Sequence, residues 1–284
     1  MMTVIMKNMI GMMTMKEFPN DKVKMLQFPG LNGDCNISHF ITTRHGGVSK
    51  GNYASFNPGE FSGDDTEAVR LNRELLSAAI GIPPENIYAP YQIHEAGIFA
   101  IEEPFLDFSL EEQRRCLNGI DAVVTDVAGI CIAVSTADCV PVLLYAPDKK
   151  VVAAVHAGWR GTVKQIVLKT IRFIANKYAV DPIHIKAGIG PSISREAFEV
   201  GDEVVRAFVE AGVSLSDSMV RNEQTGKAHI DLWEVNRVQL LQAGLLPENI
   251  EIAGICTYAE HKDFFSARRL GIKSGRIMSG IIKK

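Results

Sequence analysis

The chain lacks paired cysteines, runs of basic residues and long apolar segments. Its five cysteines are scattered and form no Cys-x-x-Cys pair, so neither a disulfide framework nor a four-cysteine zinc site is predicted. The formal net charge is −3, and no Lys/Arg run is interleaved with aromatics, which argues against nucleic acid as a partner. No segment has the apolar length that a bilayer requires, so no membrane partner is expected. These features together predict a cytoplasmic protein.

Length and composition are those of an ordinary globular protein. The chain has 284 residues, 46% apolar and 22% charged, which is enough to bury the core of one large domain or two small ones. Its first residues are rich in methionine but are interrupted by Lys7 and Lys16. We interpret residues 1–20 as a flexible leader and residues 21–284 as a single folded domain.

The middle of the chain has the pattern of buried strands with polar residues at their ends. Two apolar runs, 141–146 and 151–157, flank the sequence Pro-Asp-Lys-Lys, which predicts two strands joined by a short turn. A hairpin centred on this turn places His156 opposite Pro141, two residues from Cys139. Cys139 and His156 then share a face, about 7–8 Å apart at Cα, whereas a slip of one residue would separate them.

Helix and strand patterns alternate, and one passage occurs twice. Apolar residues recur at helical spacing over 64–81 and end at a glycine. The helix, Pro-Glu-Asn-Ile and strand pattern of 71–94 returns in 235–258, with a weaker copy over 171–190. We interpret this as an internal duplication packed about a pseudo-twofold axis, with a period too irregular for a solenoid. The segment 275–280 is predicted to be an edge strand.

Three polar residues stand in glycine-rich settings that suit anion binding. Arg44 follows a strand pattern over 36–43 and precedes paired glycines. Arg160 lies where a strand gives way to a helix with Thr162 as its predicted N-cap, so the helix dipole and the guanidinium both favour an anion. Ser192 ends a Gly-Ile-Gly-Pro-Ser turn that suits a phosphate or ribose, although such turns are common. The alternatives for the arginines are a surface loop and a structural salt bridge.

Three residues form a candidate metal site. His94, Cys139 and His156 each stand at the end of a predicted strand, and Cys/His₂ is a known zinc ligand set. Catalytic zinc keeps three protein ligands and leaves a fourth position for water. The alternative is a buried cysteine that packs as a small apolar residue beside two core histidines. The residues alone support both interpretations equally.

Motifs along the chain resemble those of one known family. In this order they are TRHGGVS at Thr43, QIH at Gln92, TADCVPVLLYAP at Thr136, VHAGWRGT at Val155, GIGPSIS at Gly188 and FFSARR at Phe264. These motifs resemble the laccase-domain family, whose members were first called multicopper polyphenol oxidases and later recognised as purine nucleoside phosphorylases. The resemblance runs from about Cys35 to the C-terminus.

This resemblance implies a fold, a reaction and a site. It implies an α+β protein, a layered α/β/β/α sandwich of mixed sheets with an internal duplication. It implies that adenosine, inosine and methylthioadenosine are cleaved by phosphate, with adenosine deamination as a second activity. It also implies that His94, Cys139 and His156 are the catalytic and zinc-binding triad, with copper as the alternative metal.

Phosphorolysis requires a site that holds an anion, stabilises positive charge on the ribose and protonates the leaving purine. Arg44 and Arg160 are the candidates for phosphate, because a guanidinium binds oxyanions bidentately. Ser192 is predicted to join them as a substrate contact. Asp138 could orient a ligand histidine or cap a turn. Trp159 could stack on the purine or belong to the core.

Other functions stay open at this stage. A copper-dependent polyphenol oxidase would share the Cys/His₂ set, but a full multicopper oxidase needs His-x-His pairs and the chain has none. A non-catalytic zinc-binding module would use the same ligands. A cysteine hydrolase would use Cys139 with His156. Neither the preferred nucleoside nor the oligomeric state follows from the sequence.

Overall fold

Residues 14–284 are described by the computed structural model, and their strands form two six-stranded sheets and one three-stranded sheet. The first sheet contains, in order, β1 (Lys16–Glu17), β2 (Met25–Gln27), β3 (Ile37–Thr42), β15 (Ile277–Lys283), β7 (Cys131–Thr136) and β4 (Ile87–Tyr88). The second contains β14 (Ile250–Ile252), β10 (Lys186–Ile189), β8 (Val140–Ala146), β9 (Val151–Ala157), β6 (Ala122–Thr125) and β5 (Ile98–Ile101). The small sheet contains β11 (Glu199–Val200), β13 (Ala228–Ile230) and β12 (Met219–Arg221).

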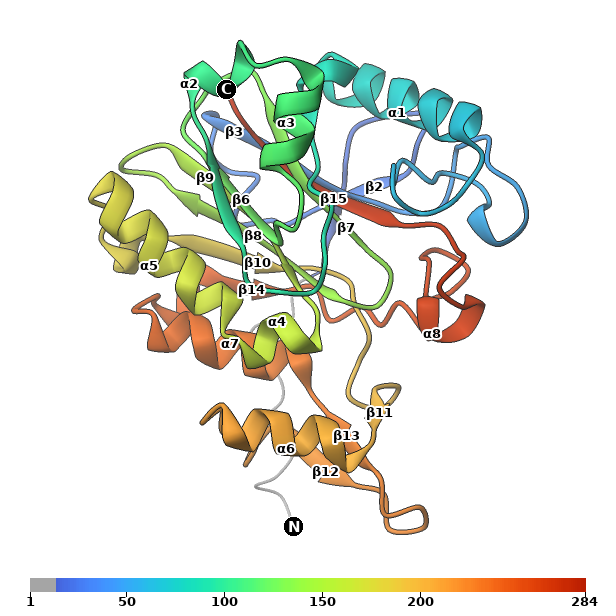
Figure 1. Cartoon of the computed structure of the whole chain (residues 1–284), viewed down its shortest axis with the longest axis vertical. Coiled ribbons are helices and arrows are strands. Elements are labelled where there is room, and N and C mark those ends of the chain that lie inside the picture. Colours follow the sequence, from blue (N-terminus) through green and yellow to red (C-terminus); the bar gives the residue numbers. More distant parts are fainter. Residues whose placement is uncertain (1–13) are drawn as a thin grey trace.

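The α-helices lie mainly outside the two large sheets. They are α1 (Thr66–Ile80), α2 (Glu103–Leu106), α3 (Leu110–Cys116), α4 (Trp159–Val163), α5 (Ile166–Tyr178), α6 (Asp202–Glu210), α7 (Leu232–Gln242) and α8 (Ala267–Leu270). Short 3₁₀ turns occur at η2 (Gly51–Tyr53), η3 (Pro84–Asn86), η4 (Pro182–His184) and η5 (Pro247–Asn249). The small sheet and α6 project from the end of the molecule opposite α1 (Figure 1).

The two large sheets pack face to face between layers of helices (Figure 1). Side chains of β8 and β9 alternate between the two sides of their sheet: Val155 packs on the side covered by α5 and α7, whereas Leu143 and Ala154 face the other sheet. Leu76 of α1 covers the outer face of the first sheet. The predicted α+β fold with α/β/β/α layers is confirmed.

The repeated sequence passage gives the same local structure on each large sheet. In the first copy α1, η3 and β4 follow one another, and in the second copy α7, η5 and β14 do. Both strands lie at a sheet edge and pair in parallel with their neighbours, β4 with β7 and β14 with β10. The weaker copy gives α5, η4 and β10. The predicted repeat therefore corresponds to a repeated structural unit.

Two helix starts can be compared with the sequence. The Asp65 side chain caps α1 by accepting from the Ala68 N–H, and Gly81 ends the helix in the left-handed region, as the pattern over 64–81 predicts. The prediction of Thr162 as an N-cap is wrong. Thr162 lies inside α4, and the longer helix α5 begins only after Gln165, at φ 57°. The buried hydroxyl of Thr162 instead donates to the Ala157 carbonyl.

Strand predictions failed where pairing is non-local. The predicted edge strand over 275–280 is β15, which lies in the middle of the first sheet between β3 and β7. Gly280 is needed there because an added Cβ would lie 2.5 Å from the Phe40 ring. The predicted strand in 71–94 is reduced to β4, and Pro90, which has no N–H to donate, follows shortly after it.

The predicted leader is only partly described. Residues 1–13 lie outside the described residues, and within the rest Lys16–Glu17 pairs with β2 as the edge strand of the first sheet.

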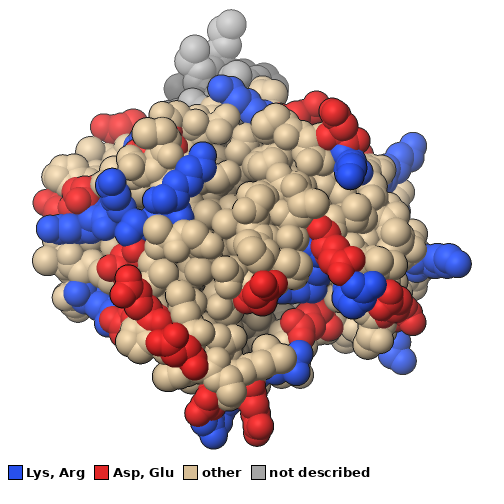
Figure 2. Space-filling view, turned by 90° about the horizontal axis from the view of Figure 1, so that it is seen from above, with Lys and Arg blue, Asp and Glu red and all other residues tan. Residues whose placement is uncertain are grey.

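On the face that carries α1, α2 and α3, basic side chains are interspersed with acidic ones and separated by wide uncharged areas (Figure 2). In residues 14–284, no helix combines the length and the apolar character needed to cross a bilayer.

Candidate metal and catalytic site

Cys139 and His156 lie at the same end of the β8–β9 hairpin. The two strands pair with Pro141 opposite His156, which confirms the predicted register. His156 is 3% exposed and points, like Ala154 on the same face of β9, toward the other sheet. Cys139 directly precedes β8 and is half-buried. The hairpin therefore brings a thiol and an imidazole to one edge of the core.

His94 joins this pair from the loop that follows β4. The ligand atoms of His94, Cys139 and His156 all lie within 4.8 Å of one another. The two imidazole rings meet edge to face, with their centroids 4.8 Å apart and an angle of 80° between their planes. His94 is exposed and His156 is buried, so the cluster opens to solvent on the His94 side.

A buried carboxylate that the sequence analysis missed, Asp121, holds two members of the cluster in place. Asp121 is 0% exposed, and its Oδ1 accepts from Nδ1 of His156 at 2.7 Å. Its two oxygens also accept the backbone N–H groups of His94 at 3.0 Å and Glu95 at 2.8 Å. This fixes the His156 ring with Nδ1 toward Asp121 and Nε2 toward the cluster.

Strand pairing explains why Asp121 is there. It directly precedes β6, which pairs antiparallel with β9 so that Ala122 lies opposite Val155. Asp121 therefore lies opposite His156. The available sequence signal was an acidic residue directly before the apolar run Ala-Val-Val, because a carboxylate buried there needs a partner.

The backbone is strained at two positions beside the ligands. His94 has φ 64° and Asp138, which precedes Cys139, has φ 84°. Such conformations cost roughly 1–3 kcal/mol for residues other than glycine and persist only where surrounding contacts impose them. Hydrogen bonds to Asp121 provide those contacts for His94. Two of the three ligands are thus presented by loops that tertiary contacts hold in shape.

Within the cluster, Cys139 and His156 form a charged pair at neutral pH. Burial would raise the pKa of the Cys139 thiol, but His156 and His94 together lower it to about 6 from an ordinary 9.0. Burial would lower the pKa of His156, but Cys139 and Asp121 raise it to about 9 from 6.5. Between these values the thiol is a thiolate and the His156 ring an imidazolium. A thiolate is the form of cysteine that binds metals and attacks electrophiles.

Gly158 gives the cluster its space. A Cβ at this position would lie 3.0 Å from the His94 ring and 3.1 Å from Sγ of Cys139. Any other residue would push these two side chains apart. The glycine between β9 and α4 is therefore part of the site.

The chain matches the family model described as multi-copper polyphenol oxidoreductase laccase over residues 38–284. It belongs to this laccase-like family. A protein from Bacteroides thetaiotaomicron called purine nucleoside phosphorylase is 48% identical over 91% of this chain and 96% of its own length. Adenosine deaminase RL5, from an unknown prokaryotic organism, is 43% identical over 87% of this chain and 94% of its own.

A solved structure shares the laccase-like fold. The crystal structure of the Bacillus licheniformis hypothetical protein YfiH is similar with a TM-score of 0.85 and 28% identity, over 94% of this chain and 99% of that one. The similarity therefore extends over both large sheets and the elements between them.

Asp138 caps a turn in this laccase-like chain, and within residues 14–284 its carboxylate forms no hydrogen bond with His94 or His156. Its carboxylate accepts from the hydroxyls of Thr257 at 2.7 Å and Ser266 at 3.0 Å, and from the Arg268 N–H at 2.7 Å. Of the two roles considered from the sequence, turn capping is the one observed. The orienting role belongs to Asp121.

The two predicted phosphate arginines differ in their freedom. Arg44 is half-buried, its Nε and Nη1 donate to the carbonyls of Ala54 and His261, each at 2.8 Å, and burial lowers its pKa. Arg160 is exposed on α4, two residues beyond Gly158, and its guanidinium lies 4.3 Å from the Trp159 ring centroid. The Trp159 ring thus packs against the Arg160 guanidinium in a cation–π contact. Of these two arginines, Arg160 is the exposed one, and it lies four residues after His156 in the sequence.

Ser192 is buried and hydrogen-bonded within the protein. Ser192 is 0% exposed, its hydroxyl donates to the Gly190 carbonyl at 3.1 Å, and it accepts from Nε1 of Trp233 at 2.6 Å. These contacts are structural, and the role of Ser192 as a substrate contact stays a prediction. A cation that the sequence analysis did not single out, Arg276, is close enough for the Cys139 thiolate to raise its pKa, although burial lowers that pKa overall.

Proposed function

We propose that this protein is a purine nucleoside phosphorylase whose active site is the His94, Cys139 and His156 cluster, with adenosine deamination as a second activity. The observation that carries the proposal is the convergence of three ligand atoms within 4.8 Å beside a buried carboxylate. The names of two relatives, a purine nucleoside phosphorylase and an adenosine deaminase, support both activities. The proposed substrates are phosphate with adenosine, inosine or methylthioadenosine, in the cytoplasm.

The donor set fits a zinc ion. Cys139 provides a thiolate, and the bond from Nδ1 of His156 to Asp121 leaves Nε2 of that ring for the ion. His94 supplies the second imidazole. A zinc ion held there would supply a Lewis acid that activates water for attack on C6 of adenine. Copper is the alternative metal, because Cys/His₂ is also a copper ligand set.

The residues themselves can serve phosphorolysis. Breaking the N-glycosidic bond leaves positive charge at C1′ of the ribose and an extra electron pair on the purine. A phosphate oxygen then bonds to C1′, and the purine takes up a proton. The Cys139 thiolate favours positive charge nearby, and in the metal-free cluster the His156 imidazolium holds a proton that the purine can take. Asp121 keeps the ring oriented for this transfer. We assign phosphate to Arg160 because its guanidinium is free to bind an oxyanion.

The test is a comparison of Cys139→Ala with Cys116→Ala, a substitution at a half-buried cysteine on α3 outside the cluster. Release of hypoxanthine from inosine is measured with and without phosphate. We expect phosphate-dependent release by the parent and by Cys116→Ala, and none by Cys139→Ala at an unchanged melting temperature. Unchanged turnover by Cys139→Ala would refute the assignment.

Three alternatives predict different results in the same preparation. A copper-dependent polyphenol oxidase would show an intense blue colour and oxidise phenols after copper loading. A non-catalytic zinc module would bind zinc without an exchangeable water and turn over no nucleoside. A cysteine hydrolase would lose a phosphate-independent activity when Cys139 is alkylated in metal-free protein. In residues 14–284 the structure shows one cluster of three or more metal-ligating side chains, which favours the single-metal reading over a multicopper enzyme.

A further inference from the structure

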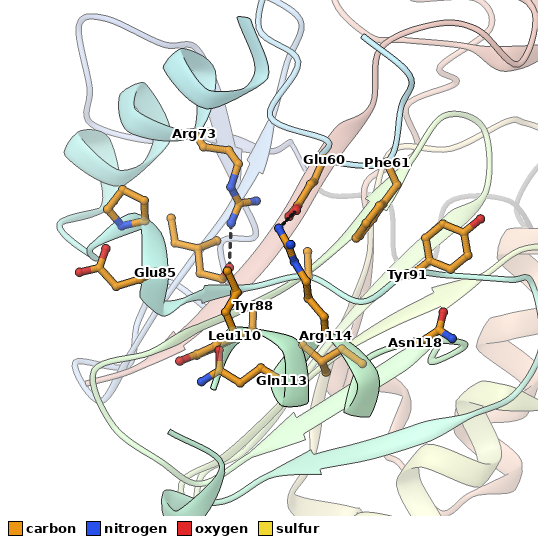
Figure 3. A pocket seen from close by; sticks show the side chains of 14 residues that line it. Glu60, Phe61, Arg73, Glu85, Tyr88, Tyr91, Leu110, Gln113, Arg114 and Asn118 are labelled. Atoms are coloured by element: carbon orange, nitrogen blue, oxygen red, sulfur yellow. Dashed lines mark hydrogen bonds and ion pairs between the residues drawn. The ribbon is translucent and has the colours of Figure 1, made fainter. Parts of the chain in front are cut away.

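A cavity lies beside β4, at the edge of the first sheet. It has a volume of about 360 Å³ and is bounded by α1, η3, β4 and α3 (Figure 3). None of His94, Cys139 and His156 lines it. Its volume is within the range of small-molecule sites, about 300–1,000 Å³.

The mouth of this cavity gathers large apolar side chains that are open to water. Phe61, Tyr91 and Leu110 line it and are 51%, 48% and 64% exposed. Phe61 and Tyr91 stand edge to face with their centroids 5.0 Å apart. Exposed apolar groups that converge on a concave site indicate a ligand with apolar or aromatic surface.

Arg73, which lines the cavity, forms no direct ion pair with any of residues 14–284. Arg73 extends from α1 toward β4, and its Nη2 donates to the Ile87 carbonyl at 2.9 Å (Figure 3). Its Nη1 is buried and has no hydrogen-bond partner among residues 14–284. Two carboxylates line the same cavity: Glu60 is paired with Arg114 at 3.1 Å, and Glu85 is exposed. Glu60 is also close enough to Arg73 to act against the effect of burial on its pKa. Burial nevertheless lowers the pKa of Arg73.

A buried charge without a partner is costly, and a ligand that supplies the opposite charge removes that cost. The cavity therefore offers a guanidinium that no carboxylate pairs directly, together with an exposed apolar rim. Sulfonate, carboxylate and phosphate groups all match a guanidinium of this kind.

We propose that this cavity is a second ligand site, which binds a small planar aromatic molecule bearing one anionic group. The ring lies against Phe61, Tyr91 and Leu110, and the anionic group faces Arg73. The proposal is independent of the proposed activity, because it concerns binding at residues outside the cluster.

Two wall segments continue into the cluster, so the two sites must be separated by experiment. The Tyr91 N–H donates to the Leu117 carbonyl at 3.1 Å, and the Gly119 N–H donates to the Tyr91 carbonyl at 2.9 Å. His94 follows the first segment and Asp121 follows the second. A competition measurement with inosine distinguishes a second site from an extension of the nucleoside site.

The probe is 8-anilinonaphthalene-1-sulfonate, whose fluorescence rises in apolar sites, and its neutral match is N-phenyl-1-naphthylamine. We expect one sulfonate probe per chain, bound at least ten-fold more tightly than the neutral probe. Arg73→Met should abolish this difference. Arg70→Met should retain it, because Arg70 is exposed on the same helix and paired with Glu67 and Glu74. Equal binding of both probes, or parent-like affinity in Arg73→Met, would overturn the proposal.

Leu110→Glu provides a second variant at an exposed position, so that folding is not in question. It places a negative charge at the rim and should weaken sulfonate binding at least ten-fold, whereas parent affinity would refute the site. Saturating inosine should leave the bound sulfonate probe in place. Its displacement by inosine would contradict a separate site, whether or not the protein cleaves inosine.

Discussion

Each large sheet contains a buried histidine, with a cysteine in the same sheet or directly beside it, and the two pairs have opposite charge states. In the first sheet, His39 on β3 and Cys131 on β7 are 1% and 0% exposed. Burial lowers the pKa of His39 to about 4 and raises that of Cys131 to about 12, so both are neutral at pH 7. Beside the second sheet, His156 has a pKa of about 9 and Cys139 a pKa of about 6, so both are charged.

Neighbouring groups explain the contrast, since burial by itself would lower the pKa of both histidines and raise that of both cysteines. Nε2 of His39 accepts the Phe28 N–H at 2.8 Å, which requires a neutral ring nitrogen. Nδ1 of His156 instead faces the Asp121 carboxylate, and its ring lies beside a thiolate. The Cys139 thiolate and, after it, the Asp121 carboxylate thus raise the pKa of a core histidine enough to keep it charged. Residue type and burial alone would not distinguish a site from a core.

Thiol reactivity should separate the two cysteines by the largest factor. In metal-free protein at pH 7, iodoacetamide should modify Cys139 at least about 1,000-fold faster than Cys131, because only Cys139 is a thiolate and accessible. The rate at Cys139 should level off above about pH 6–7. Peptide mapping by mass spectrometry measures both rates. A rate that still rises steeply between pH 8 and pH 9 would contradict the lowered pKa.

Removing the Asp121 carboxylate should bring the pair Cys139 and His156 closer to the neutral state of Cys131 and His39. We expect Asp121→Asn to lower kcat/KM for inosine and affinity for zinc by about 10–100-fold, since partners of this kind orient the ligands. The control is Asp126→Asn, at an exposed position just beyond β6. Zinc titration and steady-state kinetics are the measurements. Values within two-fold of the parent would show that Asp121 does not position His156.

His39 should dominate the pH dependence of stability on the first sheet. Its pKa is about 4 in the folded protein and 6.5 when unfolded, so the unfolded chain binds the proton first as the pH falls. Its contribution is therefore present above pH 6.5 and is lost between pH 6.5 and 4, by about 3 kcal/mol. Urea unfolding of the parent and His39→Gln at pH 7, 6 and 5 measures this. Parallel losses in both proteins would contradict the assignment.

Local sequence patterns were sufficient to predict strand register where the paired strands are neighbours in the sequence. The β8–β9 register followed from a four-residue turn, and with it the approach of Cys139 and His156. The same reasoning failed for β15, whose partners β3 and β7 lie far away in sequence. Asp121 was missed for that reason, because its place opposite His156 depends on the pairing of β6 with β9. Long-range register, more than residue chemistry, limited the prediction of the site.

The two large sheets also differ in the arginine that follows one of their strands, and substitutions at these arginines should have the smallest effects. Arg44 follows β3 of the first sheet and is tied to two carbonyls, whereas Arg160 follows β9 of the second and is exposed. We expect Arg160→Ala to raise KM for phosphate about ten-fold, with KM for inosine little changed, because one charge-assisted contact to an oxyanion is lost. Arg44→Ala should instead lower the melting temperature by about 5 °C and leave KM for phosphate unchanged. Phosphate titrations and thermal unfolding of both variants provide the measurements. The reverse pattern would place phosphate beside Arg44, and it would mean that a guanidinium already bound to carbonyls can still recruit an anion.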